Sequence, residues 1–168
     1  MNPDEFKTML GRLDRIAEEV GARRRKVLVV DDDEGVRELV KAVLRRKRDS
    51  LEQVCVGTAA EAEREIRSGE VDFLILDEIL PDERGTELAA RLIREGVLHC
   101  PTMLISGIAS PDERQKLQDR GRDIQARMLL FKEPGMSWFE LPYFIEQILG
   151  ACPRASMLQI SDLPVRGC

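Results

Sequence analysis

Apolar and polar residues follow two distinct patterns between residues 26 and 150. In the first pattern, short runs of mostly apolar and often β-branched residues occur, which is typical of strands buried on both faces. Such runs predict strands at Val27–Val30, Gln53–Val56, Phe73–Leu76, Thr102–Ile105 and Met128–Phe131. The second pattern lies between these strands and repeats every three to four residues, which indicates amphipathic helices.

The helical pattern is clearest after the first predicted strand, where apolar residues follow the spacing i, i+3, i+4, i+7 and i+8: Val36, Leu39, Val40, Val43 and Leu44. Later helices are expected to begin at Thr58, which forms a capping box with Glu61, at Gly85, at Pro111 after the cap Ser110, and at Ser137. The helix from Pro111 is unusual, because residues 109–123 are almost wholly polar. We therefore expect it to dock weakly on the rest of the domain.

Strands and helices in strict alternation imply a mostly parallel sheet that helices cover on both faces. Because crossovers between parallel strands are right-handed, the expected fold is α/β with a doubly wound five-stranded sheet. In such a sheet the functional site lies outside the carboxyl ends of the strands, where the strand order reverses.

Two segments lie outside this predicted core of residues 26–150. Residues 1–25 are predicted to hold an amphipathic helix and a basic linker, because residues 4–20 place these apolar side chains on one helical face: Phe6, Met9, Leu10, Leu13, Ile16 and Val20. The helix needs a partner, either its own domain or a second copy of the chain in a homodimer. Residues 151–168 contain two prolines and few large apolar residues, and they are predicted to be an extended tail.

The composition narrows the classes of partner. The 168 residues carry 26 Lys and Arg against 31 Asp and Glu, so the net charge of -5 provides no general attraction to nucleic acid or anionic lipid. The four cysteines and single histidine show no zinc-site spacing. Since neither a signal peptide nor a long apolar run is present, we expect a cytoplasmic protein that does not insert into membranes.

Acidic residues follow two of the predicted strands. Asp31, Asp32 and Asp33 come directly after the first, and Asp77 comes after the third, ahead of a loop that contains proline and glycine. If these strands are neighbours, their carboxylates meet at one edge of the sheet and repel one another unless a cation lies between them. Mg²⁺ prefers such oxygen ligands, although Asp33 is equally well explained as the cap of the following helix.

A hydroxyl and a cation complete the set, because Ser106 follows the fourth predicted strand and Lys132 follows the fifth. Together with a metal ion, these groups can neutralise the oxygens of a phosphoryl group. Asp77 can then attack phosphorus as the nucleophile, and phosphoryl transfer needs little beyond such positioning and charge neutralisation.

In these residues the sequence resembles the receiver domain of bacterial two-component response regulators, over about residues 26–150. The motifs that carry the resemblance are Val29-Val30-Asp31-Asp32-Asp33, Leu74-Ile75-Leu76-Asp77-x-x-x-Pro81-x-x-x-Gly85, Leu104-Ile105-Ser106-Gly107 and Phe131-Lys132-x-Pro134. Each motif alone is weak, but all of them in order at strand ends make a specific signal. The resemblance implies a flavodoxin-like (βα)5 fold with the strand order 2-1-3-4-5.

The resemblance also implies a role for each residue of the site. Asp77 is expected to accept the phosphoryl group, with Ser106 and Lys132 contacting its oxygens. Mg²⁺ is expected to bind Asp77, Asp32 directly, Asp31 through water and the backbone carbonyl of Ile79. The implied protein is a single-domain response regulator rather than an enzyme. It takes its phosphoryl group from a histidine kinase or phosphotransfer protein and binds a downstream protein in response.

Two departures from the family pattern favour an alternative. Leu129 stands where the family has an aromatic residue, and Glu133 interrupts the usual Lys-Pro pair. A pseudo-receiver, which binds partners without a phosphorylation cycle, would explain both. A phosphatase of the haloacid-dehalogenase type is disfavoured, because Ile79 occupies the position of its second Asp. Since neither Ile79 nor Ile108 can orient an attacking water, we expect the phosphoryl group to be lost slowly.

Overall fold

The computed structural model describes residues 24–47, 51–107, 110–133 and 138–151. They form a five-stranded sheet with the order β2-β1-β3-β4-β5, in which all neighbouring strands are parallel. The strands are β1 Arg25–Val30, β2 Leu51–Val56, β3 Phe73–Asp77, β4 Thr102–Ser106 and β5 Met128–Phe131. The predicted fold class and strand order are therefore confirmed. The predicted N-terminal helix and C-terminal tail lie outside the described residues.

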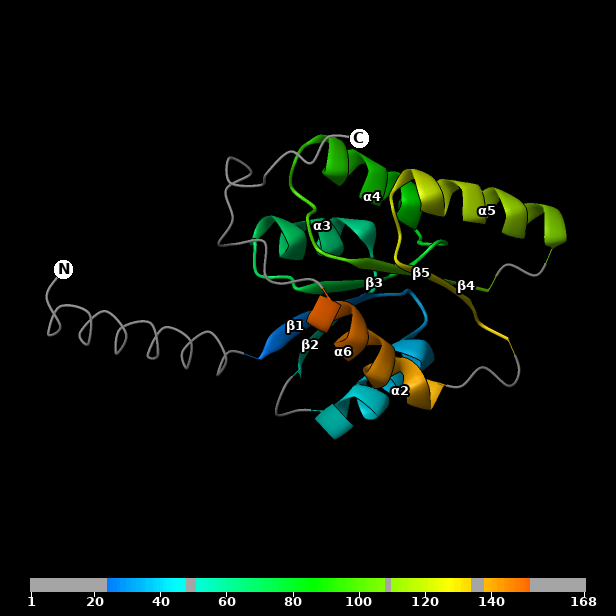
Figure 1. Ribbon diagram of the computed structural model, residues 1–168. Helices are drawn as coiled ribbons and strands as arrows, with labels where there is room; N and C mark the ends of the chain where they lie inside the picture. The colour runs from blue at the N-terminus through cyan, green and yellow to red at the C-terminus, as the bar shows by residue number, and fades with distance from the viewer. Residues whose placement is uncertain (1–23, 48–50, 108–109, 134–137, 152–168) are drawn as a thin grey trace, which may run out of the picture.

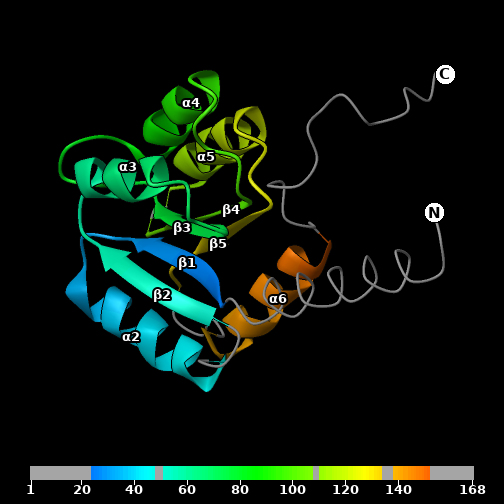
Figure 2. The same cartoon turned by 90° about the vertical axis from the view of Figure 1, so that its left-hand side faces the viewer.

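Helices cover both faces of the sheet (Figures 1 and 2). On one face lie α3 (Ala59–Arg67), α4 (Gly85–Arg94) and α5 (Pro111–Asp123). On the other lie α2 (Glu34–Leu44), which a 3₁₀ turn at Arg45–Lys47 extends, and α6 (Leu141–Ala151), which a 3₁₀ turn at Trp138–Glu140 precedes. Within the described part of the chain, no helix is both long and apolar enough to cross a membrane.

The strands read as continuous apolar runs because both of their faces are buried. In β1, Leu28 and Val30 pack into the core below α3, α4 and α5, whereas Val27 and Val29 pack into the core with α2 and α6. All four side chains are fully buried. Alternate residues of a strand point to opposite faces, so one short run contributes to two cores.

The helix starts follow the predicted caps in most cases. The Asp33 carboxylate accepts hydrogen bonds from the backbone N–H groups of Gly35 and Val36, so Asp33 caps α2. The Thr58 hydroxyl accepts from the N–H of Glu61, as expected for a capping box. Ser110 occupies the cap position of α5, but its side chain makes no capping hydrogen bond. Pro111 still suits the first turn of this helix, because its φ is preset and its missing N–H would have no partner within the helix.

The basic segment before the sheet is not wholly a linker. Strand β1 begins at Arg25, two residues before the predicted start, because Arg25 pairs in register with Leu51 of β2. The next residue, Lys26, has a structural role. Its side chain is only 12% exposed, and its ammonium pairs with Glu65 at 3.2 Å and Glu70 at 3.6 Å. The aliphatic part of the side chain is buried while the charge reaches its partners at the edge.

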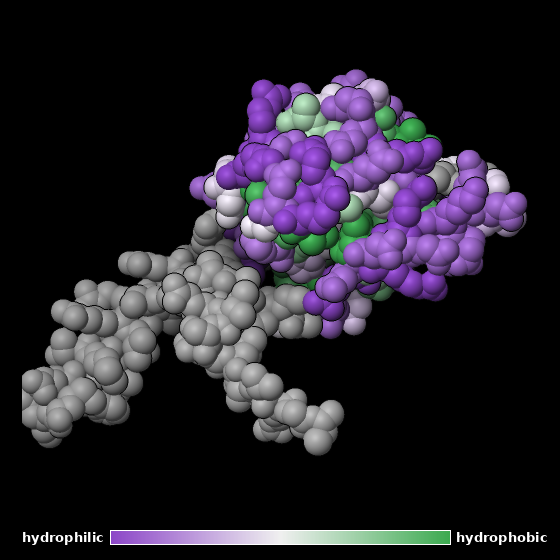
Figure 3. All heavy atoms as spheres, turned by 90° about the horizontal axis from the view of Figure 1, so that it is seen from above, coloured by the Kyte–Doolittle hydropathy of each residue, from purple (hydrophilic) through white to green (hydrophobic). Residues whose placement is uncertain are grey.

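Helix α5 docks with few apolar side chains, as its sequence indicated. Its buried residues are Leu117 and Gly121. A Cβ atom on Gly121 would lie 3.3 Å from Leu104 Cδ1, so this glycine lets the helix approach the sheet. The described surface above α4 and α5 is mainly hydrophilic, with apolar atoms visible between charged side chains (Figure 3). Polar contacts must therefore contribute to the position of α5.

Candidate functional site

The acidic residues predicted to meet at the sheet edge do so. Strands β1 and β3 are neighbours with Val30 opposite Leu76, so the residues that follow each strand are adjacent. One carboxylate oxygen from each of Asp31, Asp32 and Asp77 lies within 4.8 Å of the others. Asp31 and Asp77 are buried, whereas Asp32 is exposed. The carboxylates of Asp31 and Asp77 thus lie inside the site, and that of Asp32 lies where the site meets solvent.

Lys132 connects the two buried carboxylates. Its Nζ lies 2.7 Å from Asp31 Oδ2 and 3.2 Å from Asp77 Oδ1. The end of β5 places this side chain, and the Lys132 backbone N–H donates to the carbonyl oxygen of Ser106 at 2.8 Å. Burial acts to lower the pKa of the ammonium, but its interactions with Asp31 and Asp77 outweigh burial and raise that pKa. Lys132 therefore stays charged within the site.

Asp77 is the residue whose protonation the site alters most clearly. Burial of its carboxylate is the largest cause, and together with the charges of Asp31 and Asp32 it raises the pKa to about 6, against the opposing effect of Lys132. The carboxylate is thus mainly ionised at neutral pH while it remains easy to protonate below that. Such a shift is common at functional sites.

The donor set fits a hard divalent cation. Asp31 Oδ2 and Asp77 Oδ1 are buried and accept no well-aligned hydrogen bond among the described residues, although both face the Lys132 ammonium as ion-pair partners. All the available ligand atoms are oxygens, and exposed Asp32 leaves room for water. Mg²⁺ prefers such a site, with one or two carboxylates and several retained waters.

Ser106 ends the strand beside Asp77. In the pairing of β3 with β4, Asp77 lies opposite Ile105, and Ser106 is the next residue. Ser106 is fully buried, and it pairs in register with Phe131 of β5, the residue before Lys132. The sheet therefore brings the predicted hydroxyl and the predicted lysine to the same edge as the carboxylates.

The loop after Asp77 is closed tightly around the strand end. Glu78 accepts a backbone hydrogen bond from Gly85 at 3.0 Å, and Ile79 pairs with Arg84 in an isolated β-bridge. A Cβ atom on Gly85 would lie 2.1 Å from the carbonyl oxygen of Asp77, so only glycine fits there. The loop leaves the Ile79 side chain 55% exposed beside the site. Metal binding by its carbonyl remains a prediction.

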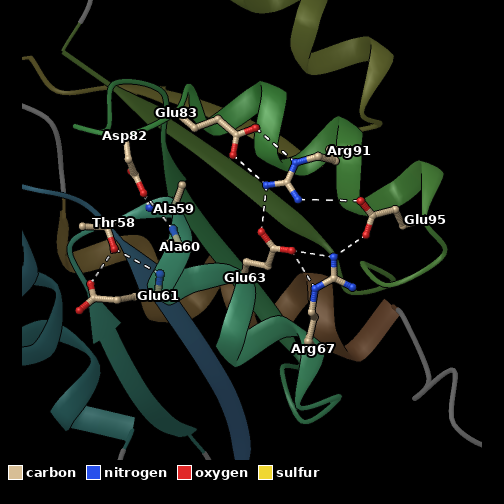
Figure 4. Close-up of polar contacts among 10 residues, drawn as sticks. All are labelled: Thr58, Ala59, Ala60, Glu61, Glu63, Arg67, Asp82, Glu83, Arg91 and Glu95. Atoms are coloured by element: carbon tan, nitrogen blue, oxygen red, sulfur yellow. Dashed lines mark hydrogen bonds and ion pairs between the residues drawn. The ribbon is translucent and has the colours of Figure 1, made fainter.

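Sequence reasoning missed how this loop is anchored to α3. Asp82 Oδ1 accepts a hydrogen bond from the N–H of Ala59 at 2.9 Å, and Oδ2 accepts from that of Ala60 at 3.0 Å (Figure 4). These bonds, that of Ala59 above all, lower the pKa of the Asp82 carboxyl. An acid at the start of α3 also favours the helix dipole. No local pattern signals such a cap, because its two sides come from different elements.

An ion-pair network extends this anchor across α3 and α4 (Figure 4). Arg91 of α4 lies 2.9 Å from Glu83 of the loop and 3.0 Å from Glu63 of α3. Arg67 then joins Glu63 to Glu95, beyond the end of α4. The network connects the loop and both helices, so they form one charge-linked unit.

Sequence reasoning also missed Glu78, which directly follows Asp77. Its side chain is fully buried although it ends in a carboxylate. Its carboxylate accepts hydrogen bonds from the Thr86 N–H at 3.1 Å and the Thr86 hydroxyl at 3.2 Å, and it pairs with Arg120 at 2.9 Å. The available signal was an acid at the end of an apolar strand, but it did not identify a partner.

The two departures from the family pattern lie on the side of the sheet below α5. Leu129 packs against the core formed with α3, α4 and α5, and so does Phe131. Glu133 pairs with Arg114 of α5, whose guanidinium also lies 4.4 Å from the ring centroid of Phe131. Glu133 thus contributes to the contact between β5 and α5.

Comparisons with known proteins agree on one family. Residues 27–133 match the family model described as response regulator receiver domain. The transcriptional regulatory protein PmrA of Pectobacterium parmentieri is 32% identical over 58% of this chain and 43% of its own length. The gliding motility regulatory protein of Myxococcus xanthus is 30% identical over 61% of this chain and 13% of its own length. The chain thus matches less than half of each of these relatives.

Solved structures show the same fold. A CheY-like response regulator receiver domain from Methanospirillum hungatei has a TM-score of 0.63 and 23% identity, covering 77% of this chain and 96% of its own. The phosphorylated cyanobacterial phytochrome response regulator RcpA has a TM-score of 0.65 and 20% identity, covering 78% of this chain and 98% of its own.

Proposed function

Because the chain belongs to the family of response regulator receiver domains, we propose that it accepts a phosphoryl group on Asp77 from a histidine kinase or phosphotransfer protein and thereby changes its binding to a downstream protein. The observation that carries this proposal is the contact of one lysine, Lys132, with the two buried acids Asp31 and Asp77. One ammonium neutralises only one of the two carboxylates, so the site keeps negative charge that suits a metal ion and a nucleophilic carboxylate.

In the proposed reaction, a phosphohistidine of the donor approaches the open side of the site, where Asp32 and Ile79 are exposed. A carboxylate oxygen of Asp77 attacks phosphorus, so an O–P bond forms while the P–N bond breaks. The electron pair of that bond leaves with the imidazole, which takes up a proton. Asp77 needs to be ionised, and its pKa of about 6 provides this state at neutral pH.

The remaining residues balance charge around the phosphoryl oxygens. Asp31, Asp32, Asp77 and the Ile79 carbonyl would hold Mg²⁺, which supplies charge neutralisation for the phosphoryl group when bound. Lys132 exchanges its contact with Asp77 for one with a phosphoryl oxygen. Ser106 donates its hydroxyl to another. Each residue then keeps a partner of opposite charge or a hydrogen bond, which favours the aspartyl phosphate.

The alternative of a pseudo-receiver rests on Leu129 and Glu133. The pairing of Glu133 with Arg114 of α5 accounts for one of these departures without loss of the site, so it supports the phosphoacceptor over the pseudo-receiver. We further propose that the protein acts in the cytoplasm as a stand-alone receiver through protein–protein contacts.

The proposal is tested by incubating the purified chain with acetyl phosphate and Mg²⁺ and measuring its intact mass. We expect the mass of one phosphoryl group to be added, and none to be added when a chelator removes Mg²⁺. Asp77→Asn should remain unmodified, whereas Asp119→Asn, which changes an exposed acid on α5, should be modified like the wild type. An unmodified wild type, or equal modification of Asp77→Asn, would reject the proposal.

A further inference from the structure

Glu78 joins three elements through a carboxylate that has no exposure to solvent. Besides the Thr86 hydrogen bonds at the start of α4, it pairs with Arg84 at 3.4 Å and with Arg120 of α5 at 2.9 Å. Its backbone N–H donates to the Ile105 carbonyl oxygen at 3.2 Å. The carboxylate and the backbone N–H of Glu78 thus both have partners, and Glu78 directly follows Asp77 in the chain.

A buried charge destabilises a protein strongly unless an opposite charge and hydrogen bonds accompany it. Arg84 of the loop and Thr86 of α4 compensate the charge of Glu78 locally, whereas Arg120 comes from α5. This helix buries only Leu117 and Gly121. With so little apolar surface to hold it, the position of α5 depends on its charged contacts, which include those of Arg114 with Glu133 and Phe131.

The other helices on this face of the sheet combine their ion pairs with more buried apolar side chains than α5 has. The network from Glu83 through Arg91, Glu63 and Arg67 connects the loop to α3 and α4 (Figure 4). Buried Leu88 and Leu92 add apolar contacts for α4. Helix α5 is therefore the element on this face whose docking is most sensitive to a change of charge.

We propose that the Glu78–Arg120 ion pair is a tether that holds α5 on the sheet and makes its docking respond to the charge of residue 77. Asp77 and Glu78 are consecutive residues and both are buried, so they lie well within a Debye length of each other with little solvent screening, and a charge on residue 77 contributes to the potential around Glu78. More negative charge there strengthens the attraction of the site for Arg120, and less negative charge weakens it. The natural charge change is the phosphoryl group, and in that respect the inference rests on the proposed function.

The tether itself is tested in the unmodified full-length chain by hydrogen exchange measured by mass spectrometry. In Arg120→Gln we expect the amides of α5 to exchange on the order of tenfold faster than in wild type, while those of α3 stay unchanged. Arg122→Gln is the matched control, because Arg122 lies on the same helix and contacts only its helix neighbour Asp119 among its recorded ion pairs. Equal exchange of α5 in the two variants would overturn the tether. Arg120→Lys, which keeps the charge, should recover part of the protection and decides the question if Arg120→Gln does not fold.

The response to charge is tested without any phosphoryl donor by Asp77→Asn at pH 7.5. We expect this substitution to speed exchange of α5 several-fold relative to α3, and to have no such effect when Arg120→Gln is already present. An equal effect in both backgrounds, or none in either, would overturn the coupling. Modification by acetyl phosphate should slow exchange of α5 in wild type alone. A wild type that takes no phosphoryl group defeats the proposed function, while the substitutions still decide the tether and its coupling.

Discussion

The ammonium of Lys132 lies 2.7 Å from the carboxylate of Asp31, and this ion pair compensates the negative charge of Asp31. Asp31 is fully buried, and a buried carboxylate is costly unless it is paired. Without a bound cation, Lys132 is the positive charge recorded in contact with both Asp31 and Asp77. Removal of this lysine should therefore affect folding as well as chemistry.

Lys132→Met should lower the free energy of unfolding by about 3 kcal/mol in Mg²⁺-free buffer, because it leaves two buried carboxylates unpaired. Urea denaturation measures this change. Saturating Mg²⁺ should restore part of the loss, since a cation between the carboxylates replaces the missing charge. Lys116→Met on the exposed surface of α5 is the control, and equal destabilisation by both substitutions would contradict the role given to Lys132.

Binding of Mg²⁺ should weaken as the pH falls below about 6. The raised pKa of Asp77, about 6, means that the folded protein binds this proton more tightly than the unfolded chain does. In the metal-free protein, the stability that protonated Asp77 provides is present at low pH and is lost as the pH rises through about 6. Because the proton and the metal compete for the same oxygens, the apparent Mg²⁺ affinity should fall by up to about tenfold per pH unit below that value.

Calorimetric titration with Mg²⁺ between pH 5 and pH 8, conditions that bracket the Asp77 pKa of about 6, measures this dependence. Asp77→Asn should bind the metal more weakly and lose this dependence on pH. An affinity that stays constant over the same range in the wild type would show that Asp77 does not titrate in the metal site.

Gly85→Ala should disrupt the loop after Asp77. The added Cβ would lie 2.1 Å from the Asp77 carbonyl oxygen and 3.0 Å from Leu76 Cγ, so the Asp77 backbone itself would have to move. We expect a loss of about 3 kcal/mol in the free energy of unfolding, together with slower modification by acetyl phosphate. At Gly150 of α6, an added Cβ meets nothing within 4 Å, so Gly150→Ala should be neutral or stabilising. Comparable losses in both variants would argue against the close approach at Gly85.

Ile79→Asn should speed the loss of the phosphoryl group from Asp77. The Ile79 side chain is 55% exposed beside the site, so an amide at this position can orient an attacking water without disturbing the core. The half-life of the modified protein, followed by intact mass after removal of acetyl phosphate, measures the change. Ile93→Asn, at an exposed position of α4, controls for general effects, and an unchanged half-life in Ile79→Asn would reject the explanation.

The sheet and the first set of site residues could be predicted from the sequence because their signals are local. A strand such as β3 is apolar throughout because both faces are buried, and an acid at its end is visible as Asp77. Arg25 was predicted to belong to the basic linker, but it is the first residue of β1 and pairs in register with Leu51.

The residues that sequence reasoning missed act through partners distant in the chain. Glu78 is buried because Arg120 and Thr86 compensate its charge, and Asp82 caps α3 across a loop. Both residues lie shortly after Asp77, in a segment where the resemblance to receiver domains implied metal ligands and no structural acids. Their roles depend on the packing of α3, α4 and α5, which no motif in the loop encodes.

The most direct test of the central claim locates the phosphoryl group on the chain. Borohydride reduces an aspartyl phosphate to homoserine, so treatment of the modified protein followed by peptide mass spectrometry identifies the modified residue. The account predicts homoserine at position 77, only after incubation with phosphoryl donor and Mg²⁺, and unmodified aspartate at positions 31, 32 and 82. Homoserine at another aspartate, or none in a wild type that has gained the mass of a phosphoryl group, would contradict it.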